Sequence, residues 1–299
     1  MIRLLLLFNL FIFFGLNLIA QTDFPSIKQQ FLDYRKADNQ DSALFIARKM
    51  SNLALKEQTD SSYWYALSLR YQGNVYETRE NNDSTLFYWL NALNIFEKYH
   101  RFTDDHATSL NLLGTYHRKI GLYITAEEFY LKSAEIRRRN GVWNSNYAYS
   151  LNNLSWLYNS MGRYSEALLL VDSSLLILQK IYLNDSLKLI NELHSKAEIL
   201  MNLSEYSLAE KHYFQCKSLC EKNNLPLEKY IKLEKDIAQL YVKKGKYAQA
   251  EVILLQVDSL LNLKEKNKEI YQLSAEIKFT LGKIKSITGQ FNEAFSYYE

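Results

Sequence analysis

The sequence contains very little proline and glycine, with two prolines and nine glycines among 299 residues. Helix interiors exclude both residues, because proline removes an amide donor and glycine loses the most backbone entropy on folding. Their scarcity over this length therefore predicts an all-α chain. The remaining composition, 47% hydrophobic and 23% charged, is ordinary for a folded protein.

Cysteine is also scarce, and Cys216 and Cys220 are the only two in the chain. With His212 they recur every four residues, which places all three side chains on one face of a helix. A metal site on that face is one interpretation, but the trio lacks a fourth ligand and matches no zinc-finger spacing. We therefore predict that Cys216 packs in a core with the other two near the surface, and that the chain holds no metal and no cofactor.

Strong charge and catalytic motifs are missing as well. The net charge of +3 is too small to indicate nucleic-acid binding. The sequence has no glycine-rich phosphate loop, no nucleophile elbow and no zinc-protease histidine pair. The basic run Arg137–Arg139 directly precedes a helix stop at Asn140, where cations are favoured by the helix dipole. These absences predict a protein that is not an enzyme and does not bind nucleic acid.

The first apolar run of the chain has the layout of a secretory signal peptide. Arg3 supplies a positive start, Leu4–Ile19 is apolar, and Ala20 provides a small residue for cleavage. A retained membrane anchor is the alternative, although this run is short for a span of about 20 residues. We predict a signal peptide over residues 1–20 that is cleaved near Ala20, and hence a periplasmic or secreted protein. No later segment approaches membrane length.

A helix break recurs along the rest of the chain at intervals of 41 to 44 residues. The breaks fall at Asp38, Glu80, Gly121, Gly162, Ser204, Gly245 and Gly289. Two residues later most units carry an aromatic side chain: Tyr123, Tyr164, Tyr206, Tyr247 and Phe291. Five residues after the break most carry alanine: Ala43, Ala126, Ala167, Ala209, Ala250 and Ala294. A glycine at the break permits the left-handed backbone that ends a helix, and alanine allows two helices to approach closely.

Each unit is therefore predicted to be an antiparallel helical hairpin whose core is completed by its neighbours. Residues 21–299 should form a right-handed solenoid of about seven stacked hairpins. The first two units lack the glycine and the aromatic residue of the corner, so we interpret them as degenerate capping repeats. The last unit has only "FNEAFSYYE" after its break, and we expect that it is truncated and that the encoded protein continues.

The repeated pattern resembles the tetratricopeptide repeat, a 34-residue helical hairpin. Leu113–Gly114 and Leu281–Gly282 match the Leu–Gly pair of its first helix. The longer period here adds seven or eight residues, close to the roughly 7.2 of two helical turns, so one extra turn in each helix would keep every face in register. The segments "HATSLNLLG" and "NYAYSLNNLS" also resemble the long repeats of kinesin light chains and of exported bacterial proteins that end in a CHAT domain.

The resemblance implies a binding surface on the first helices, which line the concave side of such arrays. Amide side chains there can pair with an extended peptide backbone, and cations can pair with carboxylates. The candidate peptide-binding residues are Arg70, Asn74, Asn111, Arg118, Lys119, Asn152, Trp156, Asn159, Lys235 and Gln239. The carboxylate clamp of the family is not matched, because Leu112 stands where an asparagine is needed. A solvated helix face without a ligand is the alternative interpretation.

The sequence thus predicts a non-catalytic scaffold that binds a protein or peptide partner. A second hypothesis makes this chain the sensory or recruiting region of a larger signalling protein, with a histidine kinase or a CHAT-type protease as the catalytic part. A catalytic site on the face of His212, Cys216 and Cys220 is the least favoured hypothesis.

Overall fold

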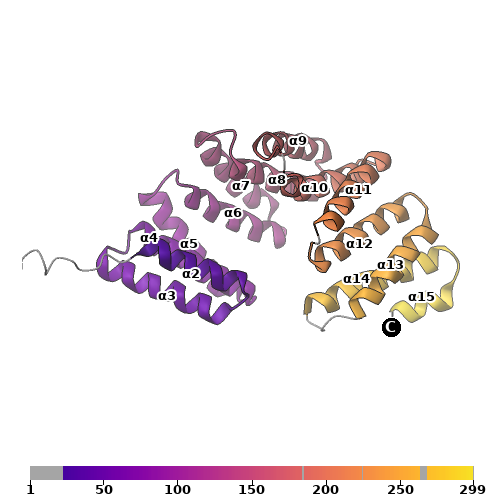
Figure 1. Cartoon of the computed structure of the whole chain (residues 1–299), viewed down its shortest axis with the longest axis horizontal. Helices are drawn as coiled ribbons and strands as arrows, with labels where there is room; N and C mark the ends of the chain where they lie inside the picture. The colour runs from indigo at the N-terminus through magenta and orange to yellow at the C-terminus, as the bar shows by residue number, and fades with distance from the viewer. Residues whose placement is uncertain (1–22, 184, 224, 263–267, 299) are drawn as a thin grey trace, which may run out of the picture. The chain divides into compact units, whose positions relative to one another are not determined.

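The computed structural model of the chain describes residues 23–183, 185–223, 225–262 and 268–298. Within these residues it shows fourteen α-helices and one short 3-10 segment, with no strand, so the all-α prediction is confirmed (Figure 1). The elements are α2 (Phe24–Lys36), α3 (Gln40–Glu57), α4 (Tyr63–Thr78), α5 (Asn82–Tyr99), α6 (Asp104–Lys119), α7 (Tyr123–Arg139), α8 (Ser145–Ser160), α9 (Tyr164–Ile181), η1 (Ser186–Leu189), α10 (Ile190–Asn202), α11 (Tyr206–Lys222), α12 (Leu227–Lys243), α13 (Tyr247–Asn262), α14 (Lys268–Ile287) and α15 (Phe291–Tyr298).

The predicted signal segment, residues 1–20, lies outside the described residues. Among the helices that the structure does describe, none combines the length and the apolar character needed to cross a membrane.

The chain divides into two compact units, and the division falls within α6, between Leu113 and Gly114. The first unit contains α2 to α5 and the start of α6, and the second contains the end of α6 and all later helices. In each unit, helices that follow one another in sequence pack against one another, as expected for stacked hairpins. The sequence did not predict the division.

Every predicted helix break is a residue with a left-handed backbone. The φ angle is +80° at Gly121 and +76° at Gly162, and it is also positive at the non-glycine breaks, for example +57° at Glu80 and +64° at Ser204. The residue after each break donates its amide hydrogen back to a carbonyl five residues earlier, as Leu122 does to His117 over 2.9 Å. This hydrogen bond closes the helix end and turns the chain into the next helix.

The two hairpins of the first unit close their corners with asparagine instead of the missing aromatic residue. The side chain of Asn39 accepts a hydrogen bond of 3.0 Å from the amide of Ser42, and Asn81 accepts one of 3.0 Å from Ser84. Such caps satisfy amide groups that a helix start leaves unpaired. The corresponding residues Leu122 and Arg163 in the second unit make no side-chain cap. The first two hairpins therefore differ in corner chemistry from the three that follow them, since Glu205 makes no side-chain cap either.

The corner alanines are buried in every hairpin that has one. Ala43, Ala126, Ala167, Ala209 and Ala250 are 0% exposed and Ala294 is 4% exposed. The predicted close approach of paired helices is thereby confirmed. Thr85 takes the same place in the second hairpin, and its hydroxyl donates to the Asn81 carbonyl over 2.8 Å.

In three hairpins, a glycine of the first helix faces a large ring of the second. A Cβ atom at Gly114 would lie 2.8 Å from the Tyr130 ring, and one at Gly282 would lie 2.7 Å from Tyr298. At Gly73 a Cβ atom would meet the Trp89 ring. Glycine is required at these positions because the ring occupies the space that any side chain would need.

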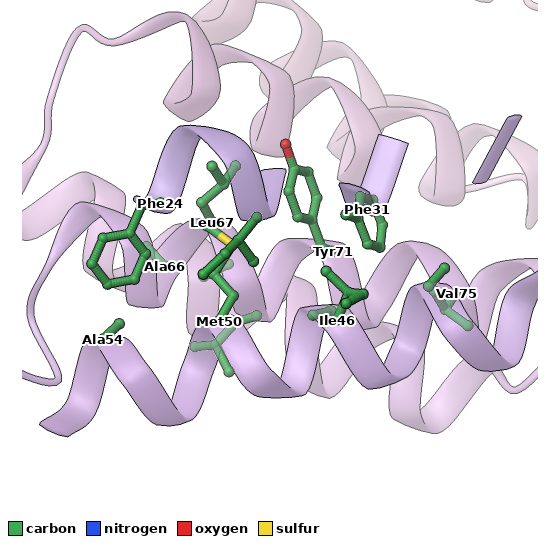
Figure 2. Packing of buried hydrophobic residues seen from close by; sticks show 14 of the residues in the cluster. Phe24, Phe31, Ile46, Met50, Ala54, Ala66, Leu67, Tyr71 and Val75 are labelled. Atoms are coloured by element: carbon green, nitrogen blue, oxygen red, sulfur yellow. The ribbon is translucent and has the colours of Figure 1, made fainter. Parts of the chain in front are cut away.

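The core of the first unit is rich in stacked rings (Figure 2). Phe31 and Tyr71 stack with centroids 4.0 Å apart, and Phe24 stacks on Trp64 at 5.2 Å. Met50 fills the interior beside them and is 0% exposed. The second unit instead contains a series of smaller clusters, each shared by neighbouring hairpins, so its core is built by stacking.

Candidate functional site

The first helices of the second unit are joined to one another by polar side-chain contacts. We call the surface that they form the first-helix face: the end of α6 together with α8, α10, α12 and α14. Between α8 and α10, the indole nitrogen of Trp156 donates to the Ser195 hydroxyl. The Asn159 amide donates to Glu198 over 3.2 Å and accepts from Asn202 over 3.0 Å. These contacts fix the side chains of two predicted binding residues, Trp156 and Asn159.

The same arrangement continues along the following helices. His194 on α10 bonds through Nε2 to the Asp236 carboxylate on α12 over 2.8 Å. Lys235 on α12 pairs with Glu276 on α14 over 2.7 Å. The cations predicted on this surface are therefore partly balanced in charge, because carboxylates lie among them. Burial raises the pKa of another of these carboxylates, Glu198, against the opposing influence of His194.

A polar pocket of about 400 Å³ opens on the first-helix face where α6, α8 and α10 meet. It contains three of the predicted binding residues. Its lining consists of Thr115, Arg118, Tyr130, Asn152, Asn153, Trp156, Asn191 and His194. The structure thus brings together Arg118, Asn152 and Trp156, which come from two different hairpins of the sequence.

The polar groups of this pocket are held in place by their neighbours. The guanidinium of Arg118 lies over the Trp156 ring, with its carbon 5.7 Å from the ring centroid. Asn152 is only 8% exposed, and its side-chain oxygen accepts from the Ser155 hydroxyl over 3.3 Å. The Asn152 amide nitrogen has no hydrogen-bond partner among the described residues, so a donor and a cation are available to a ligand.

An apolar pocket of about 140 Å³ lies on the same face between α10 and α12, with its floor on α11. Its lining consists of Ile190, Asn191, His194, Cys216, Cys220, Lys229, Lys232 and Leu233. Asn191 and His194 belong to both pockets, so the two are neighbours along the groove. Burial raises the pKa of the Cys216 thiol to about 12 and also raises that of Cys220, so both remain neutral thiols.

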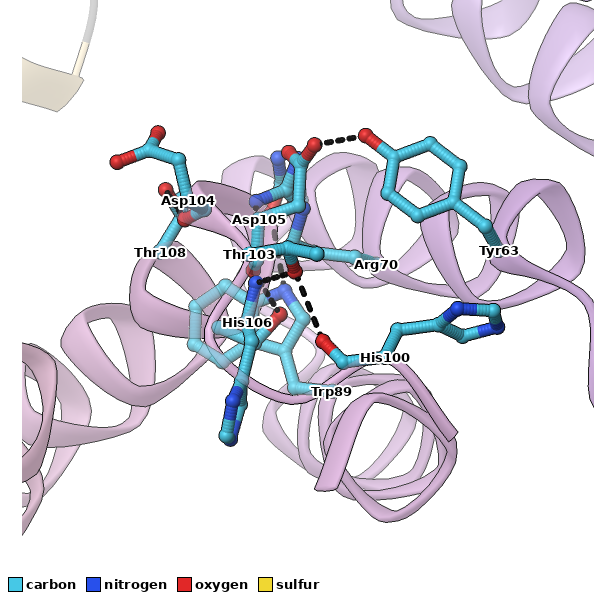
Figure 3. Close-up of polar contacts among 11 residues, drawn as sticks. Tyr63, Arg70, Trp89, His100, Thr103, Asp104, Asp105, His106 and Thr108 are labelled. Atoms are coloured by element: carbon cyan, nitrogen blue, oxygen red, sulfur yellow. Dashed lines mark hydrogen bonds and ion pairs between the residues drawn. The ribbon is translucent and has the colours of Figure 1, made fainter. Parts of the chain in front are cut away.

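The predicted binding residue Arg70, in the first unit, has structural contacts instead of facing outward (Figure 3). Arg70 is 5% exposed and forms an ion pair with Asp105, which also accepts from the Tyr63 hydroxyl. Burial opposes ionisation of Asp105, but Arg70 and Tyr63 keep the pKa of this carboxyl below its ordinary value. The expected outward position of Arg70 is therefore wrong, because the ion pair ties α4 to the start of α6.

Asn74 is also turned inward, since its side-chain oxygen accepts from the indole nitrogen of Trp89 over 2.9 Å. The remaining predicted residues lie outside both pockets. Asn111 on α6 and Gln239 on α12 are half-buried, whereas Lys119 at the end of α6 is exposed. For these three residues binding stays a prediction.

Two other features of the sequence make structural contacts. They are the helix face with His212, Cys216 and Cys220 and the basic run Arg137–Arg139. Cys216 is 2% exposed and Cys220 is 6% exposed, so the expectation that Cys220 lies near the surface is wrong. The ring of His212 bonds to Gln215 over 2.9 Å. No group of three metal-binding side chains occurs among the described residues. In the arginine run, Arg137 is buried and donates to the Ser150 hydroxyl over 2.8 Å.

Three residues that line the pockets, Asn153, Asn191 and Lys229, were not predicted from the sequence as binding residues. Asn153 follows Asn152 directly, and Asn191 stands one helical turn before His194, so its place on the same face was predictable. Lys229 was not predictable, because it reaches the apolar pocket only through the packing of α12 against α10 and α11.

The sequence model of the tetratricopeptide repeat matches residues 105–180, so this part of the chain consists of tetratricopeptide repeats. No curated protein sequence matches the chain. Among solved structures, a Rap protein complexed with competence and sporulation factor is similar with a TM-score of 0.68 and 14% identity, over 92% of this chain and 75% of that one. Aspartyl phosphate phosphatase F from Bacillus subtilis gives 0.64 and 13%, over 89% and 67%.

A putative kinesin light chain of Podosopora anserina with nearly identical repeats gives a TM-score of 0.55 and 15% identity, over 67% of this chain and 95% of that one. At such low identity these likenesses show the fold alone. The chain has the fold of tetratricopeptide-type repeat proteins, as its sequence predicts.

Proposed function

We propose that the chain is a non-catalytic interaction module and that the first-helix face of its second unit binds a peptide segment of a partner protein. The observation that carries this proposal is the polar pocket, which combines the Arg118 guanidinium, the Trp156 ring and the Asn152 amide in one hollow. A peptide offers matching groups, because its carbonyl oxygens accept from amide side chains and its carboxylates pair with arginine.

The side chains of the pocket are already fixed in position, and this supports binding. The Trp156 ring is fixed by its hydrogen bond to Ser195, and it is 37% exposed. A large side chain that is already ordered loses little entropy when a ligand packs against it. The pocket is therefore suited to binding without a costly rearrangement.

The fold agrees with this function without deciding it. One structure with the same fold is a complex of a Rap protein with competence and sporulation factor, and another is named a phosphatase. In this chain, the pocket is lined by amides, an indole and a guanidinium, which bind ligands, and also by two hydroxyls and an imidazole. The hydroxyls of Thr115 and Tyr130 bond to each other over 2.9 Å, and the His194 ring bonds to Asp236. The thiols of the neighbouring pocket are neutral and hence poor nucleophiles.

We also propose that this module acts outside the cytoplasm, because Arg3, the apolar run Leu4–Ile19 and Ala20 have the layout of a signal peptide. N-terminal sequencing of the protein purified from an expressing cell tests the proposal. The mature chain should begin at Gln21 or within a few residues of it, and a chain that retains Met1 would contradict it.

Peptide binding is tested by selecting displayed random twelve-residue peptides on the immobilised protein. Synthetic copies of the enriched peptides are then measured by fluorescence anisotropy. We expect Arg118→Glu and Asn152→Ala to weaken binding at least tenfold, since each removes a polar partner from the pocket. The matched control is Lys132→Glu, an exposed cation on the second helix α7. If no peptide is enriched, or if only Lys132→Glu weakens binding, the proposal is wrong.

A further inference from the structure

The polar and apolar pockets form two neighbouring subsites of one groove. The polar pocket lies where α8 meets α10, and the apolar pocket lies where α10 meets α12. Asn191 and His194, which line both, form the ridge between them. Packed helices are about 8–10 Å apart, so the two subsites are separated by about one such spacing. An extended peptide, at roughly 3.3 Å per residue, crosses this distance in about three residues.

The ridge can hold the backbone of a peptide that spans both subsites. His194 donates through Nε2 to Asp236 when the ring is neutral, which leaves Nδ1 as an acceptor. The Asn191 side chain is exposed and has no hydrogen-bond partner among the described residues. One acceptor and one amide are therefore present on the ridge, as an extended backbone requires.

The apolar subsite sets a limit on the size of the side chain that enters it. Its walls include Ile190 and Leu233 and the two neutral thiols. A cavity of about 150 Å³ lined by apolar groups holds a benzene molecule, so a hollow of about 140 Å³ holds the side chain of leucine or isoleucine or a phenyl ring, whereas an indole would protrude from its open side.

The charge of the groove determines which charged group a bound peptide should carry. The residues that line the two subsites include the cations Arg118, Lys229 and Lys232, and none of the lining residues is an acid. Two carboxylates lie next to the lining: Asp236 bonds to His194, and the positive charge of Arg118 favours the ionised form of Glu198. Lys229 is exposed and has no ion-pair partner among the described residues. A carboxylate is therefore favoured at the polar subsite, where Arg118 stands at its edge beside the Asn152 amide.

We propose that the groove selects extended peptides in which a leucine-sized apolar side chain and a carboxylate are about three residues apart, the first in the apolar subsite and the second beside Arg118. This proposal rests on the peptide-binding function proposed above. The carboxylate comes from an Asp or Glu side chain or from the peptide C-terminus.

The test uses fluorescein-labelled eight-residue peptides on a Gly–Ser background. Each peptide carries one apolar residue (Ala, Leu, Phe or Trp) and one Asp at separations of one to six, in both orders, with an amidated C-terminus. A second set replaces Asp by a free C-terminal carboxylate. Binding is measured by fluorescence anisotropy. We expect Leu and Phe to bind at least tenfold more tightly than Ala and Trp, at separations of three or four residues only.

Two variants assign each preference to its subsite. Cys220→Phe fills the apolar subsite and should abolish the advantage of Leu over Ala while the advantage of Asp remains. Arg118→Gln removes the cation and should abolish the advantage of Asp while that of Leu remains. If Cys220→Phe does not fold, Lys229→Trp covers the same subsite from an exposed position. Leu169→Phe on the exposed side of α9 is the control for added bulk.

The outcomes separate this inference from the function on which it rests. If no peptide of either set binds and the random library is also not enriched, both are wrong. If enriched peptides bind at Arg118 but show no preference for Leu, or keep that preference in Cys220→Phe, the two-subsite inference is overturned and peptide binding stands. Equal binding of Asp peptides to Arg118→Gln overturns the inference in the same way.

Discussion

Replacing Glu192 by glutamine should remove a pH-dependent loss of stability from the second unit. Glu192 lies in the first turn of α10 and is 0% exposed. Neither of its carboxylate oxygens has a hydrogen-bond partner among the described residues. Burial disfavours the charged form and, against an opposing contact with the residue's own backbone amide, raises the pKa of this carboxyl from 4.5 to about 7.

The sign and the size of the effect follow from this shift. Because the folded state holds the proton more tightly than the unfolded state, the protein loses stability as the pH rises from about 4.5 to about 7, and the loss is constant above that. At about 1.4 kcal/mol for each pH unit, the loss amounts to about 3 kcal/mol. The amide of Glu192→Gln does not titrate, so the variant should gain about 3 kcal/mol relative to the parent between pH 4.5 and pH 8.

The assay is urea unfolding followed by circular dichroism at several pH values from 4.5 to 8. The difference between the two proteins isolates Glu192, because all other titrating groups are shared. Glu128→Gln, at an exposed position on α7, is the matched control. The difference in unfolding free energy between this variant and the parent should not change with pH. Parallel stability profiles for the parent and Glu192→Gln would refute the reasoning, since they would mean that this carboxylate is solvated or paired in the folded state.

Three further substitutions test the packing of the hairpins. Gly114→Ala places a methyl group 2.8 Å from the Tyr130 ring and should destabilise the protein by about 1–3 kcal/mol in urea unfolding, and an unchanged midpoint would show that the two helices are farther apart. Ala167→Leu, at a position that is 0% exposed, should cost a similar amount in thermal unfolding, whereas an unaltered melting temperature would disprove the hairpin register. Glu80→Gly should stabilise the protein by up to about 1 kcal/mol, because Glu80 has a φ of +57°, and a loss of stability would contradict this account of the corner.

The repeat could be predicted because the corner depends on local chemistry. A left-handed residue followed five positions later by a buried alanine leaves the same signal in every hairpin except the second, which has Thr85, and Gly162 with Ala167 is an example. The period located even the breaks at Asp38 and Glu80, where no glycine marks them. The asparagine caps of the first two corners were also readable, since Asn39 and Asn81 directly follow the breaks and asparagine is a preferred residue at the start of a helix.

The site was less predictable because it depends on contacts between hairpins. The position of Arg70 on its helix is the same whether it faces solvent or not, and only the packing of α6 brings Asp105 against it. Lys235 reads as a free cation in the sequence, yet Glu276 of the next hairpin pairs with it. Pockets likewise arise from side chains of three or more helices, so their sizes cannot be derived from a pattern along one helix.

A crystal structure of the protein with a peptide enriched from the random library tests the central claim most directly. We predict that the peptide lies extended along α8, α10 and α12, with a carboxylate within hydrogen-bonding distance of the Arg118 guanidinium and an apolar side chain in the hollow beside Leu233. A peptide bound on the second helices, or bound in the first unit, would contradict the account.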